Sequence, residues 1–82
     1  MQPTTLPLQG DHITLAQALK VVGLAGSGGQ AKHLVRSGGI LVNGSVETRP
    51  GRKLIPGDRF QGEGAKEWII VPAEPGGRNP EP

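Results

Sequence analysis

Basic side chains are concentrated in the middle of this chain of 82 residues. The whole sequence has a net charge of +2, whereas the segment from Lys20 to Phe60 holds seven basic residues against two acidic ones, a net charge of +5. These basic residues are Lys20, Lys32, Arg36, Arg49, Arg52, Lys53 and Arg59. The distribution of charge decides which partners a protein attracts more than the total does. The segment therefore favours a polyanion, such as a nucleic acid, as the partner.

Residue types that support covalent or metal chemistry are scarce in this sequence. It has no cysteine, which removes disulfides, thiolate metal sites and thiol nucleophiles together. The two histidines, His12 and His33, make a poor zinc site. Neither has a nucleophile or a paired carboxylate evident in the sequence that would indicate acid–base catalysis. We therefore expect a protein that is not an enzyme and that uses no metal or cofactor.

The first element with a clear start signal is a helix that follows Thr14. Thr14 and Gln17 have the spacing of a capping box, in which two side chains satisfy the free amides at a helix start. Apolar residues continue at helical spacing as far as Val22, and Gly23 suits the left-handed conformation that ends many helices. The spacing predicts a helix of about two turns.

A second helix is predicted to begin after Ser27, because Ser27 and Gln30 repeat the capping-box spacing. Its apolar stripe ends before two glycines and consists of Ala31, Leu34 and Val35. Lys32 and Arg36 share one face, where like charges four residues apart repel slightly. A phosphate-binding role would account for both, and the free amides at the helix start also suit a phosphate. The alternative is that Ser27 only caps the helix and that the charges are solvated.

The rest of the chain has the pattern of strands joined by tight turns. Ile40–Val42 and Ser45–Val46 flank an Asn-Gly pair, which predicts an antiparallel hairpin. Pro50-Gly51 and Pro56-Gly57 each predict a type II turn, in which the glycine takes a positive φ. Further strands are predicted at Arg59–Gln61, at Glu67–Val71 and, as an edge strand because it contains a proline, at Thr4–Gln9.

These elements predict an α+β fold with two short helices packed on a small, mostly antiparallel sheet of four to five strands. The core must be aliphatic, since the chain has one Phe, one Trp and no Tyr, and Trp68 is expected to lie in it. We expect a single domain over residues 1–72 and a disordered tail, rich in Pro and Gly, over residues 73–82. No secretory signal or membrane span is indicated, so we expect a cytoplasmic protein, and its length fits a monomer.

The order of helix, glycine-containing loop, helix and Asn-Gly hairpin resembles the S4 RNA-binding domain. The matching segments are residues 23–35, 39–44, 52–54 and 56–58, and the likeness covers residues 13–61. In that family, which includes ribosomal protein S4, bacterial pseudouridine synthases and tyrosyl-tRNA synthetases, the domain grips structured RNA with its second helix and the adjoining β loop. The chain is similar to the small free-standing S4 proteins of bacteria, in which no catalytic domain is attached.

The resemblance implies a set of RNA contacts at the matching positions. On the helix these are Ser27, Gln30, Lys32 and Arg36, and on the β side they are Asn43, Arg49, Arg52 and Lys53. We expect Arg52 and Lys53 on a protruding loop that straddles a phosphate backbone. The implied function is non-catalytic binding of structured RNA, in a ribosomal or transfer RNA context. Because aromatic residues are nearly missing, recognition should depend on RNA shape and phosphates more than on base stacking.

One alternative from another class is a ubiquitin-like, β-grasp sulfur carrier or interaction module. Val42-Asn43-Gly44 and Pro56-Gly57-Asp58-Arg59 recur in β-grasp proteins, and such carriers end in Gly-Gly. Here Gly76-Gly77 is followed by five more residues. A β-grasp also needs a pair of strands where this sequence predicts two helices, so the order of the elements discriminates between the two folds.

Overall fold

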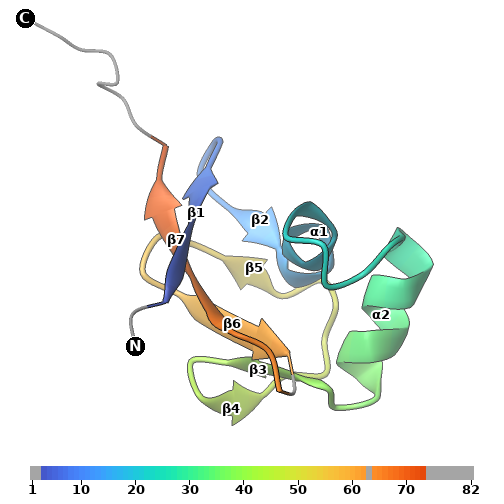
Figure 1. The fold of residues 1–82 in the computed structure, drawn as a ribbon. Helices are drawn as coiled ribbons and strands as arrows, with labels where there is room; N and C mark the ends of the chain where they lie inside the picture. The colour runs from blue at the N-terminus through green and yellow to red at the C-terminus, as the bar shows by residue number, and fades with distance from the viewer. Residues whose placement is uncertain (1–2, 63, 74–82) are drawn as a thin grey trace, which may run out of the picture.

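The computed structural model describes residues 3–62 and 64–73. Its elements in chain order are β1 (Thr4–Leu8), β2 (Ile13–Thr14), α1 (Leu15–Val21), α2 (Gly28–Arg36), β3 (Ile40–Val42), β4 (Ser45–Val46), β5 (Lys53–Leu54), β6 (Arg59–Gly62) and β7 (Glu67–Pro72). Five strands form one sheet in the order β1-β7-β6-β3-β4, and β2 pairs with β5 in a second sheet. The two helices pack side by side at one side of the molecule (Figure 1). The predicted α+β class is confirmed.

The capping box predicted for α1 is formed in full. The backbone N–H of Gln17 donates to Thr14 Oγ1 at 3.2 Å, and the backbone N–H of Thr14 donates to Gln17 Oε1 at 3.0 Å. At the other end of α1, Gly23 has a φ of +81°, the left-handed conformation expected of a residue that ends a helix. Both ends of α1 are therefore set by local sequence signals.

The start of α2 differs in one hydrogen bond from the predicted capping box. The backbone N–H of Gln30 donates to Ser27 Oγ at 3.1 Å, as expected. Gln30 Oε1, however, accepts from the backbone N–H of Gly26 at 2.7 Å, one residue before the position that a capping box requires. A Cβ at position 26 would lie 2.9 Å from Gln30 Oε1, so glycine permits this close approach.

The core is aliphatic around a single phenylalanine, as the composition predicts. From the helices, its fully buried side chains are Leu15, Ala18, Leu19, Ala31 and Val35. From the strands, the core includes Ile40, Leu54, Phe60 and Ile70. Trp68 is partly buried and packs against this core, and Lys66 Nζ lies 4.9 Å from the centre of its ring. The indole is therefore attached to the core rather than enclosed in it.

The first strand, β1, lies at one edge of the sheet and pairs in parallel with β7, with Thr4 opposite Trp68 and Leu8 opposite Pro72. The Leu8 carbonyl faces β7, because it accepts from the backbone N–H of Ala73 at 3.1 Å. Backbone groups alternate in direction along a strand, so Pro7 has its nitrogen on the open edge, where a missing N–H costs nothing. The predicted edge strand is confirmed, and it is the parallel member of an otherwise antiparallel sheet.

The loop between β4 and β5 docks on the start of α1, which the sequence does not predict. The backbone N–H groups of Leu15 and Ala16 donate to the carbonyls of Arg52 and Pro50 at 2.8 Å and 3.0 Å. Two of the free amides of a helix start are satisfied in this way. The pairing of Ile13 with Leu54 in the second sheet holds the same segments together.

The docking also corrects the predicted type of the Pro50-Gly51 turn. The turn is closed by the N–H of Arg52 and the carbonyl of Arg49 at 3.1 Å, but Gly51 has no positive φ, which a type II turn requires. The peptide that joins Pro50 and Gly51 points in opposite directions in type I and type II turns. Here the Pro50 carbonyl must point toward the N–H of Ala16, from which it accepts a hydrogen bond, and this direction excludes type II. In the Pro56-Gly57 turn the central peptide has a different partner, because the N–H of Gly57 donates to the carbonyl of Ile70 at 2.8 Å, and Gly57 takes the expected φ of +99°.

The order of elements overturns the β-grasp alternative. Both helices precede the β3–β4 hairpin, and the strands β1 and β2 that precede the helices belong to different sheets. The Gly-Gly pair of that alternative and the predicted disordered tail, apart from Ala73, lie outside the described residues. Within the described chain, no helix has the length and apolar character to cross a membrane.

Candidate nucleic-acid interface

The outward face of α2 carries the first group of predicted contacts. Ala31 and Val35 are fully buried, and their burial fixes how the helix is rotated. Lys32 and Arg36 each follow one of these buried residues by one position, about 100° around the helix, and both are exposed. No ion pair to either residue is found within the part of the chain that the structure describes. The helix thus presents two cations on one face to the solvent.

Ser27 and Gln30 lie at the start of the same helix, where both make backbone hydrogen bonds. Ser27 Oγ and Gln30 Oε1 act as acceptors in the bonds given above, so the Ser27 hydroxyl hydrogen and the Gln30 amide NH2 group are not used by them. Both residues are exposed. The two side chains thus stabilise the helix and retain donors suited to an anion.

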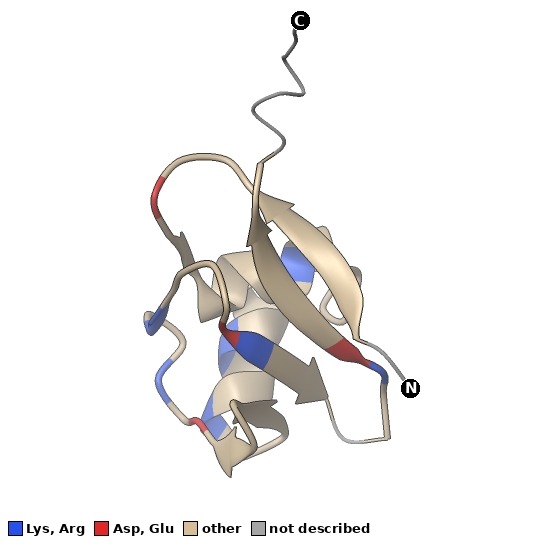
Figure 2. Ribbon diagram, turned by 90° about the vertical axis from the view of Figure 1, so that its left-hand side faces the viewer, with Lys and Arg blue, Asp and Glu red and all other residues tan. Residues whose placement is uncertain are grey.

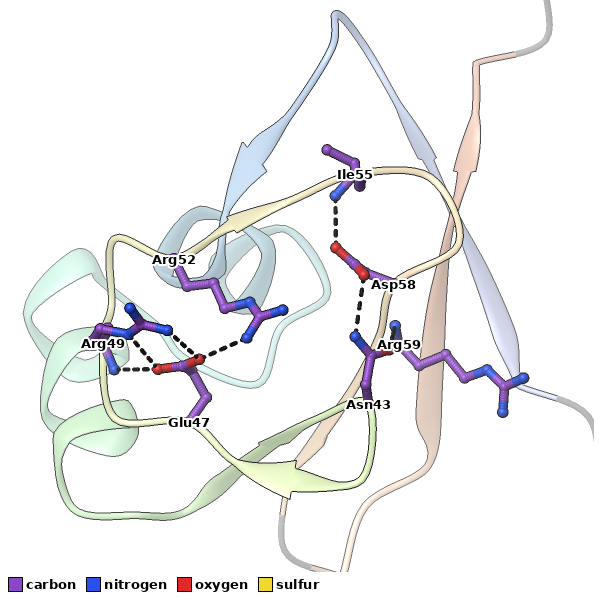
Figure 3. A network of polar contacts seen from close by, with 7 residues as sticks. All are labelled: Asn43, Glu47, Arg49, Arg52, Ile55, Asp58 and Arg59. Atoms are coloured by element: carbon purple, nitrogen blue, oxygen red, sulfur yellow. Dashed lines mark hydrogen bonds and ion pairs between the residues drawn. The ribbon is translucent and has the colours of Figure 1, made fainter.

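On the β side, one buried carboxylate holds two of the predicted arginines (Figure 3). Glu47 Oε2 accepts from the backbone N–H of Arg49 and from Arg49 Nε, both at 3.0 Å. Glu47 Oε1 accepts from Arg49 Nη2 at 3.3 Å and from Arg52 Nη1 at 2.9 Å. The side chain of Glu47 is 8% exposed, against 76% for Arg49 and 32% for Arg52. The acid is therefore buried, whereas Arg49 is largely exposed and Arg52 is partly exposed.

Electrostatics in this cluster follow from the same contacts. Hydrogen bonds from Arg49 and Arg52 lower the pKa of Glu47 from 4.5 to about 2, although burial acts in the opposite direction. The carboxylate in turn raises the pKa of Arg49 above its usual value. Glu47 and Arg49 are therefore both charged at neutral pH, and together with the Arg52 guanidinium they give the cluster a net charge of +1.

Asn43 occupies a different kind of position from the other predicted contacts. It takes a φ of +52° in the β3–β4 turn, and its side chain links the hairpin to β6 (Figure 3). Asn43 Nδ2 donates to Asp58 Oδ1 at 3.1 Å, and Asn43 Oδ1 accepts from the backbone N–H of Arg59 at 2.9 Å. Asp58 Oδ2 also accepts from the backbone N–H of Ile55 at 3.0 Å. The structure gives Asn43 a structural task, and its role as an RNA contact stays a prediction.

Lys53 and Arg59 are the remaining basic residues on the β side of the segment from Lys20 to Phe60. Lys53 is exposed, but it belongs to strand β5 opposite Thr14, which corrects the prediction that Arg52 and Lys53 share a protruding loop. Leu54, the next residue of the strand, is fully buried. Arg59 is exposed and was not predicted as a contact, and in Figure 3 its side chain points away from the Glu47 cluster.

The two groups of cations come from neighbouring parts of the fold. A Cβ placed on Gly38, just after α2, would lie 3.9 Å from Val46 Cγ1 on β4, so the end of the helix is next to the strand that leads to Glu47. Figure 2 shows Lys and Arg positions on the helices and along the loop that follows β4. The described residues include no cluster of three or more His, Cys, Asp or Glu side chains that would hold a metal ion.

The sequence analysis did not predict a role for Glu47, because it included this acid only in the net charge of the segment from Lys20 to Phe60. The signal was present, since an acid two and five residues before two arginines in a tight turn is close enough to pair with both. It also missed the Asp58 link to Asn43, which joins residues 15 positions apart.

Comparison with known proteins agrees with this architecture. The model of the S4 domain family matches residues 6–70. The chain is 36% identical over 66 residues to a Bacillus subtilis protein named "Probable ribosome maturation protein RlbA", covering 80% of this chain and 93% of the relative. It is 41% identical over 60 residues to an Escherichia coli protein named "Putative RNA-binding protein YbcJ", covering 73% of this chain and 86% of the relative. The chain belongs to the S4 domain family.

Proposed function

We propose that the protein binds structured RNA, without catalysing a reaction, through one basic surface. This basic surface consists of Ser27, Gln30, Lys32, Arg36, Asn43, Arg49, Arg52 and Lys53. The observation that supports it best is the pair of exposed cations on α2, next to a loop whose two guanidiniums are oriented by a buried acid. Cations in fixed positions suit a phosphate backbone, and two arginines offer planar forks that match phosphate oxygens.

Membership of the S4 family and the names of the relatives support the same proposal. One relative is named for ribosome maturation and another for RNA binding. We therefore assign the protein a structured region of ribosomal or transfer RNA as its target, bound by a cytoplasmic monomer. Crosslinking in cells followed by sequencing of the attached RNA identifies the target, and recovery of no RNA above background contradicts the proposal.

The test of the surface itself is the double substitution Lys32→Gln with Arg36→Gln. If both cations contact phosphates, affinity for ribosomal or transfer RNA falls by about tenfold or more, because two charge-assisted contacts are lost at roughly 1 kcal/mol each. The melting temperature stays the same or rises slightly, since a like-charge repulsion on an exposed face is removed. Affinity is measured by titration of labelled RNA on the preparations used for melting.

A matched control removes the same charge elsewhere. Lys20 on α1 lines the groove between β1 and α1, and Lys66 precedes β7 beside Trp68. Lys20→Gln with Lys66→Gln therefore lowers the net charge by two without touching the basic surface. Equal losses of affinity in the two double variants would show that only the net charge matters, and the surface would have to be placed elsewhere.

A further inference from the structure

Within the described chain, Glu47 is the charged residue that the fold buries, at 7% exposure. Burial of a carboxylate is costly unless hydrogen bonds compensate for the lost water. Here four donors compensate: the backbone N–H of Arg49, two nitrogens of its guanidinium and one of Arg52. This acid is therefore tied into the loop and is not a solvated surface group.

The bonds hold the guanidiniums and leave most of their donors unused. Arg49 contributes Nε and Nη2 to Glu47, which engages one edge of its fork. Arg52 contributes a single Nη1 bond. A guanidinium has five N–H donors, so these contacts occupy two on Arg49 and one on Arg52. The side chain of Arg49 is 76% exposed and that of Arg52 is 32% exposed, so both retain solvent-accessible surface while they contact Glu47.

Charge alone does not explain an acid in this place. On a surface that binds a polyanion, a carboxylate beside two arginines lowers the local positive potential and opposes binding. Its benefit must come from geometry. A free arginine side chain loses much rotational freedom when it grips a phosphate, and a side chain that is already fixed loses less.

We propose that Glu47 is a positioning residue, which presents Arg49 and Arg52 as a preformed site for the phosphodiester backbone of RNA. This inference rests on the proposed function and adds how the β side of the basic surface works. Glu47 touches the two arginines and not the RNA. The docking of the same loop on α1, through the carbonyls of Pro50 and Arg52, fixes the backbone from which both guanidiniums extend.

The decisive variant is Glu47→Gln, compared with Asp11→Asn as a control. Both changes remove one negative charge, but Asp11 is exposed in the loop before β2. If Glu47 positions the arginines, Glu47→Gln weakens binding of labelled ribosomal and transfer RNA by about tenfold and makes the salt dependence shallower by about one phosphate contact. Asp11→Asn leaves affinity unchanged or slightly raised. If Glu47 only dilutes the positive charge, Glu47→Gln binds more tightly than the wild type with a steeper salt dependence, and the proposal is overturned.

Two variants that keep the charge decide the question if Glu47→Gln does not fold. Glu47→Asp retains the carboxylate but is one methylene too short to bridge both arginines, and Arg52→Lys retains the cation but loses the fork. Positioning predicts weaker binding in both, whereas a charge-only role predicts wild-type affinity. The proposed function is tested separately by Arg49→Gln with Arg52→Gln. If that pair leaves affinity unchanged, the β side of the basic surface is wrong. If it weakens binding while the Glu47 variants do not, only the positioning role is wrong.

Discussion

At the scale of single residues, the predicted RNA contacts differ in whether their side chains also stabilise the fold. Lys32 and Arg36 have no structural partner among the described residues, whereas Asn43 fixes a turn through both its backbone and its amide. A substitution at Asn43 therefore changes folding and binding together. Its structural share must be measured before any effect on RNA is interpreted.

Asn43→Gly and Asn43→Ala separate the two structural tasks of this residue. Both lose the side-chain link to Asp58 and Arg59, which costs about 0.5 to 1.5 kcal/mol per hydrogen bond. Alanine also lowers the free energy of unfolding by about 1 kcal/mol, because it is strained in the left-handed conformation, and glycine is not. We expect Asn43→Ala to be the less stable of the two, as measured by urea unfolding. Equal stability would show that the strain of alanine at this φ does not exceed the extra chain entropy that glycine loses on folding.

The lowered pKa of Glu47 predicts how stability depends on pH. The pKa is about 2 in the folded protein and 4.5 when the contacts are absent, so the unfolded chain binds more protons between these values. Stability from Glu47 is therefore fully present above about pH 4.5 and is lost as the pH falls toward 2. We expect the wild type to exceed Glu47→Gln in stability at pH 6 and the difference to shrink over this window. Unfolding midpoints of both proteins from pH 2 to 6 measure it, and a constant difference would contradict the assignment.

At the scale of elements, Ser27 at the start of α2 is both the helix cap and a proposed phosphate contact. Ser27 Oγ caps the helix by accepting from Gln30, and its hydroxyl hydrogen is the part proposed to meet RNA. Capping needs an acceptor and phosphate binding needs a donor. A side chain with only the acceptor therefore distinguishes them.

Ser27→Asp keeps the helix cap but replaces a hydrogen-bond donor with a negatively charged acceptor. Aspartate is as good an N-cap as serine and its charge suits the helix dipole, so stability should be unchanged or higher. RNA affinity should fall, because a carboxylate stands where a phosphate is proposed. Ser27→Ala should lose about 1 kcal/mol of stability and less affinity than the aspartate variant. Thermal melting and RNA titration of both give the answer, and undiminished affinity in Ser27→Asp removes Ser27 from the surface.

The elements also show which parts of the fold can be predicted from a sequence of this kind. The two helix starts and the Asn-Gly hairpin follow from signals within four residues, and all are present. The β2–β5 pair has two residues in each strand and so shows no periodicity to detect. The type of the Pro50-Gly51 turn depends on Ala16, 34 positions away along the chain, and no local rule contains that contact. For the site, spacing placed Lys32 and Arg36 on one face, but the burial of Glu47 required the tertiary structure.

At the scale of the whole molecule, the cations are spread over two structural units. Lys32 and Arg36 belong to α2, and Arg49, Arg52 and Lys53 belong to the loop after β4 and to β5. An RNA that contacts both units must span them, so several phosphates are engaged at once. Binding of this kind releases many counterions.

The measurable consequence is a steep dependence of affinity on salt. With roughly four to seven basic groups each on a phosphate, a plot of log Kobs against log salt concentration should have a slope of about −3 to −6. Titrations of the same RNA at several salt concentrations give this slope. A slope near zero would indicate that binding rests on uncharged contacts and would contradict the proposed surface.

The parallel pairing of β1 with β7 has a consequence for how the protein is made. Thr4 has its partner at Trp68, so β1 leaves the ribosome long before the strand that covers its inner edge. At about 5 to 20 residues per second, the chain between them takes on the order of several seconds to synthesise. During that time α1, α2 and the β3–β4 hairpin can assemble from contacts close in sequence, which form quickly. Leu6 and Leu8 on β1 have no neighbouring strand until β7 is synthesised. The N-terminal strand is therefore the last part of the sheet to pair.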